Sequence, residues 1–156
     1  MSLLFTEASS NELVSALISV ISSGAPTSKP YIEIYAGTRP CNTSTTNGDN
    51  LLLATILLNE NPFTIPSAGI AIANSSTPQS NIPVGGVATW FRMYNRDAEV
   101  VLDGDITGPA GDVKPSCSGG QSRGFIDGDL IFDLPQFFKG NLIGLEILAL
   151  TTPAIN

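Results

Sequence analysis

Apolar and polar positions follow a helical spacing in the first part of this chain and a strand spacing afterwards. In SSNELVSALISVISSG (residues 9–24), apolar side chains recur every three or four positions, which predicts an amphipathic helix. Ser9 and Glu12 fit a capping box at its start, and Gly24 fits its end. Its apolar face would consist of Leu13, Val14, Leu17, Ile18 and Ile21. This face predicts packing on the chain's own domain or contact with a neighbouring subunit.

After residue 30 the apolar spacing changes to two, which is typical of strands. In YIEIY (31–35), two isoleucines would face one way, and Tyr31, Glu33 and Tyr35 the other. LLLATILL (51–58) is a continuous apolar run, which fits a strand buried on both faces or one that contacts a subunit. AGIAIAN (68–74) alternates small residues with isoleucines and predicts a further strand.

The segments VATWFRMYN and EVVLDGDI flank a short polar connection, which predicts a β-hairpin with its tip at residues 96–98. Trp90 and Arg92 would share one face of this hairpin. Trp90 is either a packing residue or a platform for a ligand. Arg92 would stack on it, or pair with Asp103 or Asp105 across the hairpin.

Turn signals separate several more short strands, and the strands do not alternate with helices. We therefore predict a mainly β protein. Its architecture would be an antiparallel, jelly-roll-like β-sandwich in residues 30–152, preceded by one amphipathic helix in residues 1–25.

The charge content narrows the range of partners. Only 13% of the residues are charged, against about 25% in a typical soluble domain, which suits a surface covered by neighbours. The net charge is −7 and the seven cations are scattered, so we expect no nucleic-acid partner. No signal peptide, basic surface helix or membrane-length apolar run is visible, so we expect no membrane partner and synthesis without export.

Candidate chemistry is sparse. The chain has no histidine, which removes the commonest general base and metal ligand, and it has no phosphate-binding glycine loop. Cys41 and Cys117 lack the spacing of a zinc pair and are either bridged or reduced.

Two Asp-Gly-Asp pairs would either supply oxygens to Ca²⁺ or protect strand ends from pairing. These weak metal candidates are Asp103, Asp105, Asp127 and Asp129. A glycosidase carboxylate pair is a third use, but no aromatic array marks a sugar cleft. We therefore expect no enzyme, no cofactor and no bound metal.

Five short motifs follow the helix in a fixed order. They are I-x-I-Y-x-G-x-x-P (32–40), L-L-A-T (52–55), Pro-Phe (62–63), A-T-W-F-R (88–92) and D-G-x-I (103–106). In this order they resemble a family of small bacteriophage virion structural proteins. The resemblance extends to about Asp112, and the apolar GNLIGLEILAL segment beyond it departs from the family's polar closing strand.

The resemblance implies a virion structural component, made in the cytoplasm of the host bacterium, and it brings no catalytic residues. We expect a capsid decoration (cement) protein in several copies, and a head–tail junction or tail component is the alternative. Its partners would be the major capsid protein or other virion proteins, and the chain would form a homo-oligomer. The candidate interface residues are Leu13, Leu17, Ile18, Ile21, Tyr31, Tyr35, Trp90 and Arg92.

Two other hypotheses come from other classes of protein. A glycan- or receptor-binding module would use the loops at 38–50 and 107–123, because sandwiches often carry sites on loops. A metal-assisted hydrolase would use the Asp-Gly-Asp pairs.

Overall fold

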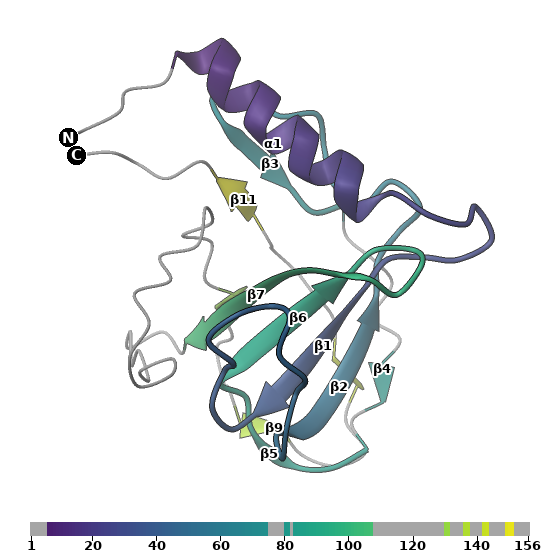
Figure 1. The fold of residues 1–156 in the computed structure, drawn as a ribbon, viewed down its shortest axis with the longest axis vertical. Helices are drawn as coiled ribbons and strands as arrows, with labels where there is room; N and C mark the ends of the chain where they lie inside the picture. Colours follow the sequence, from purple (N-terminus) through teal and green to yellow (C-terminus); the bar gives the residue numbers. More distant parts are fainter. Residues whose placement is uncertain are drawn as a thin grey trace.

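A computed structural model describes residues 6–74, 80–81, 83–107, 130–131, 136–137, 142–143 and 149–151. In these residues the chain is mainly β, with one N-terminal helix (Figure 1). The elements in chain order are α1 (Glu7–Ile21), β1 (Tyr31–Ala36), β2 (Leu51–Leu57), β3 (Ile70–Ile72), β4 (Ser80–Asn81), β5 (Gly86–Val87), β6 (Trp90–Tyr94), β7 (Val100–Thr107), β8 (Leu130–Ile131), β9 (Gln136–Phe137), β10 (Leu142–Ile143) and β11 (Ala149–Thr151).

The largest sheet in the described residues has the strand order β2-β1-β6-β7-β8. Its first four strands pair antiparallel, and β8 runs parallel to β7. Three two-stranded pairs accompany it: β4 with β10, β3 with β11, and β5 with β9. The prediction of a helix followed by a mainly antiparallel β fold is confirmed, as is the β6–β7 hairpin. The jelly-roll-like sandwich stays a prediction.

One face of the four antiparallel strands, here called the inner face, holds the core. Ile32 lies between Ile56 and Met93 in the register, and all three are buried. Ile34 lies beside Phe91 in the next inner row. Ile32 and Ile34 therefore share one face, as the period-two pattern of β1 predicted, because alternate strand residues point to opposite faces.

Helix α1 begins earlier than the sequence suggested. Thr6 is the N-cap, in an extended conformation, and its Oγ1 accepts the Ser9 N–H at 3.2 Å. Ser9 is therefore in the first turn, and the predicted Ser9–Glu12 capping box is wrong. Thr6 does the capping because its extended backbone aims its hydroxyl at the free first-turn amides.

The hairpin tip holds the C-terminal end of α1 against the chain's own domain. The Arg96 N–H donates to the Ser23 carbonyl at 3.0 Å. The Ala25 N–H donates to Oδ1 of Asp97 at 2.8 Å. Gly24 has φ +114°, and a Cβ there would lie 2.7 Å from the Asp97 carboxylate. Between the two packing modes that the helix pattern left open, the structure shows packing within the chain.

Strand β2 lies at an edge of the main sheet and is buried on one face only. Leu53, Ala54 and Ile56 are buried, whereas Leu51, Leu52 and Leu57 are exposed. These three exposed residues, without Leu53, are called the β2 leucines below. A strand buried on both faces within this chain is therefore the wrong interpretation of LLLATILL. Among the described residues, no helix is long and apolar enough to cross a membrane.

Candidate functional site

The outer face of the main sheet, opposite the core, gathers most of the residues that the sequence singled out. Its side chains form three rows across four strands. The rows are Leu52–Tyr35–Trp90–Asp105, Thr55–Glu33–Arg92–Asp103 and Leu57–Tyr31–Tyr94–Val100. The structure thus brings together polar and aromatic residues from β1, β6 and β7.

A bidentate ion pair lies at the centre of this face. Arg92 Nε donates to Asp103 Oδ1 at 2.6 Å, and Arg92 Nη2 donates to Asp103 Oδ2 at 2.7 Å. Both side chains are only 3% exposed. The hydrogen bond to Asp103 is the main reason why the pKa of Arg92 is raised above its ordinary value. Pairing across the hairpin with Asp103 or Asp105 was one alternative predicted for Arg92, and in the structure its partner is Asp103.

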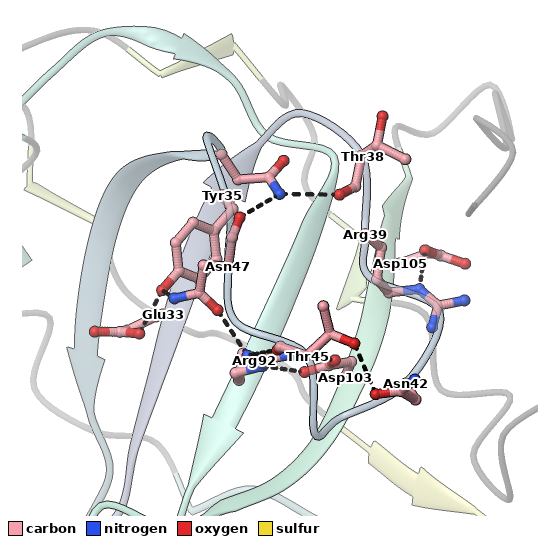
Figure 2. A network of polar contacts seen from close by, with 11 residues as sticks. Glu33, Tyr35, Thr38, Arg39, Asn42, Thr45, Asn47, Arg92, Asp103 and Asp105 are labelled. Atoms are coloured by element: carbon pink, nitrogen blue, oxygen red, sulfur yellow. Dashed lines mark hydrogen bonds and ion pairs between the residues drawn. The ribbon is translucent and has the colours of Figure 1, made fainter. Parts of the chain in front are cut away.

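The loop between β1 and β2, residues 37–50, lies over this ion pair (Figure 2). Arg92 Nη1 donates to the Thr45 carbonyl at 3.0 Å and to Asn47 Oδ1 at 2.7 Å. Asn47 Nδ2 donates in turn to the Tyr35 hydroxyl, which donates to Glu33 Oε2 at 2.6 Å. A continuous hydrogen-bonded chain therefore runs from Asp103 to Glu33 and anchors the loop on the sheet.

Two aromatic side chains form the second layer of this anchor. The rings of Tyr35 and Trp90 stack with centroids 4.4 Å apart and an interplanar angle of 12°. The Arg92 guanidinium carbon lies 5.5 Å from the Trp90 ring centroid, so Arg92 both stacks and pairs. Burial, followed by the hydrogen bond to Glu33, raises the pKa of Tyr35. Trp90 has no exposed surface and is a packing residue in this structure.

A second ion pair anchors the start of the same loop. Arg39 Nε donates to Asp105 Oδ1 at 2.8 Å, and these side chains are 10% and 24% exposed. Thr89 Oγ1 donates to the Gly37 carbonyl at 2.7 Å. Loop 37–50 is thus held at both ends of its path across the sheet.

The residues of the first Asp-Gly-Asp motif divide between the two faces of β7. Asp103 and Asp105 each accept hydrogen bonds from an arginine on the outer face. Gly104 lies opposite Phe91 in the register, and a Cβ there would lie 2.4 Å from two ring carbons of Phe91. The motif therefore supplies two arginine partners and leaves space for one aromatic ring.

Only some of the candidate metal ligands lie at described positions. No group of three or more His, Cys, Asp or Glu in the described residues is placed to hold a metal ion. Asp127, Asp129 and Cys117 lie outside the described residues, as does most of the 107–123 loop. Cys41 is exposed in loop 37–50.

The third row is more open to solvent than the two beneath the loop. The Tyr31 and Tyr94 rings stack at 4.6 Å, and both are partly buried. Burial is the main cause of a raised pKa for each of these tyrosines. Leu57, at the β2 end of the row, is 53% exposed.

The predicted interface residues fall into two groups. Ile21, Tyr35, Trp90 and Arg92 are buried within the chain and are not accessible to a partner in this structure. Ile21 packs in the core, and the other three belong to the network that holds loop 37–50 on the sheet. The other four retain surface: Leu13 is exposed, and Leu17, Ile18 and Tyr31 are partly buried.

Three residues of the network were not singled out from the sequence. They are Arg39, Thr45 and Asn47, all in loop 37–50. Asn47-Gly48 is a dipeptide typical of turns, and Gly48 has a positive φ of +58°. A turn signal does not reveal which distant side chain the asparagine will contact.

No protein-family model matches the chain, and no curated protein or solved structure shows a significant match to it.

Proposed function

We propose that this chain is a bacteriophage virion structural protein, and specifically a capsid decoration protein that assembles in several copies on the particle. The order of its motifs supports the virion assignment. In this proposal residues 30–152 form a jelly-roll-like sandwich, the main sheet is one of its layers, and the major capsid protein is the principal partner.

The exposure of the β2 leucines is the main observation that supports a role in assembly. Leu51, Leu52 and Leu57 are exposed at a sheet edge whose strand contains no charged residue. Exposed edge strands usually carry charges or proline that prevent pairing with other chains. Exposed apolar side chains on an uncharged edge strand fit a surface that neighbours cover in an assembly.

The test is quantitative mass spectrometry of purified virions, normalised to the major capsid protein. A ratio near one copy per capsid subunit, or per three-fold position, is the expected result. A handful of copies would place the protein at the head–tail junction or in the tail instead. Absence from the virion would refute the structural role.

A second candidate function is a glycan- or receptor-binding module, and the anchoring of loop 37–50 favours it. Residues 42–46 of this loop are exposed and polar, while the buried Arg92 network fixes the loop backbone beneath them. Rigidly held polar loops are common binding sites because little entropy is lost on binding. A glycan array tests this: binding that is lost when residues 42–46 are replaced by glycine and serine would support it, and a negative array would refute it.

A further inference from the structure

A second region with unusual exposure lies away from the main sheet, where a small β ribbon packs under helix α1 (Figure 1). Residues 63–73 fold into a hairpin that includes β3, and β11 pairs with the other edge of β3. On the face toward α1, Phe63, Ala71 and Ala73 are buried in the same core cluster as Val14 of the helix.

The isoleucines of this ribbon point away from the core. Ile70 and Ile72 flank Ala71 in β3 and are 43% and 48% exposed, and Ile65 in the same hairpin is 91% exposed. A shift of the register by one residue would bury the isoleucines and expose the alanines. Hydrophobic burial alone would favour that shifted arrangement.

Specific polar contacts fix the observed register. Ser67 and Ile70 exchange two backbone hydrogen bonds of 2.9 Å across a two-residue turn. Ala68 and Gly69 in this turn have φ of +50° and +73°, as a type I′ turn requires. Asn11 of α1 accepts the Gly69 N–H at 2.7 Å. The turn and the helix together therefore hold the isoleucines on the outside.

We propose that the outer face of this ribbon, formed by Ile70, Ile72 and the adjacent Ile65, is a contact surface for a second copy of this chain. Each copy carries a net charge of −7, so most faces of two copies repel one another. Residues 61–91 contain no Asp, Glu, Lys or Arg. Contact through the ribbon buries apolar side chains without bringing like charges together.

The geometry suits a self-complementary contact. Two flat strand faces pack face to face about 10 Å apart, and a two-fold axis would place the isoleucines of one copy on those of the other. Three isoleucines make less than the roughly 800 Å² per partner of a standard interface. The contact should therefore be weak in solution, with a dissociation constant on the order of 100 μM, and should strengthen where copies are held side by side.

The test is sedimentation velocity of the full chain over a concentration series from about 10 μM to about 1 mM, around the expected dissociation constant. The double variant Ile70→Thr/Ile72→Thr keeps β-branched side chains and removes apolar surface. Val20→Thr is the matched control, because Val20 is similarly exposed, at 50%, on helix α1. We expect the wild type and the control to associate, and the double variant to associate at least tenfold more weakly.

A wild type that stays monomeric throughout the series would overturn the proposal, as would a folded double variant that associates like the wild type. If the double variant does not fold, methyl NMR spectra of the wild-type protein over a dilution series provide the test instead. Concentration-dependent shifts at Ile70 and Ile72 but not at Val20 support the contact, and their absence overturns it. The experiment uses purified protein without virions, so its outcome is independent of the virion assignment.

Discussion

The outer face of the main sheet and the outer face of the β3 ribbon are both sheet surfaces turned away from the core, yet they are opposite in character. The first is polar and aromatic, and loop 37–50 covers its ion pair. The second is apolar, uncharged and exposed. A polar face can be buried when its groups bond to one another. An apolar face can be left open when turns and a helix fix its register.

The largest expected effect comes from breaking the covered face at its centre. Arg92→Met should lower the free energy of unfolding by about 3–5 kcal/mol, because it leaves the buried Asp103 carboxylate without its partner. Urea unfolding measures the loss. Arg39→Met, at the more exposed pair, is the control and should cost about 1 kcal/mol or less. Equal losses in the two variants would contradict the difference in burial that separates the pairs.

A smaller effect is expected beneath the covered face, in the Asp-Gly-Asp motif. Gly104→Ala should cost about 1–3 kcal/mol, because its Cβ overlaps the Phe91 ring on the inner face. The double variant Phe91→Leu/Gly104→Ala should lose less than the sum of the two single losses. Strict additivity in urea unfolding would show that Phe91 is not the group that requires glycine.

The loop itself can be loosened by removing one anchor. Asn47→Ala removes the bonds to Arg92 and Tyr35 and should cost about 1–2 kcal/mol. Limited proteolysis should cut loop 37–50 faster in this variant. Thr43→Ala, at an exposed position of the same loop, is the control and should leave the cleavage rate unchanged.

Alkaline pH should lower the free energy of unfolding through the tyrosines on the outer face of the main sheet. Tyr31, Tyr35 and Tyr94 have raised pKa values, so the folded chain holds their protons more tightly than the unfolded chain. Their contribution is fully present below the unfolded pKa of about 10 and is lost as the pH rises further. Urea midpoints measured from about pH 8 to about pH 11 should fall above pH 10, and Tyr35→Phe should flatten the fall. An unchanged slope in that variant would rule out Tyr35 as a contributor.

The smallest effect is expected on the open ribbon. Ile65→Thr should change the free energy of unfolding of the monomer by no more than about 0.5 kcal/mol, because its side chain is 91% exposed. Urea unfolding at low protein concentration measures this. A loss above about 1 kcal/mol would show that Ile65 packs within its own chain. The outer face of the ribbon would then not be an open face.

Local patterns located much of the fold. The alternation in β1 correctly placed Ile32 and Ile34 on one shared face, and the hairpin around residues 96–98 has the expected tip. The helix was found, but its start was not, because Thr6 and Ser9 are both acceptable caps in the sequence. In β3 the alternation was visible, but which of its faces is buried was not.

The candidate site shows the same division between local and distant information. Pairing of Arg92 with Asp103 could be predicted, because the two residues lie opposite one another in a hairpin. The partners in loop 37–50 could not, because Thr45 and Asn47 reach Arg92 across 47 and 45 positions of the sequence. No local spacing encodes such a contact.

The sequence by itself determined the β-rich class, the helix, the hairpin and the scarcity of charge, because these depend on residue type and on spacing along one strand or one helix turn. Only the tertiary structure decided which faces are closed. A loop buried the Arg92 network, and α1 with a tight turn kept Ile70 and Ile72 outside. Burial depends on what packs from a distance, so the same alternating pattern produced a core strand in β1 and an open apolar face in β3.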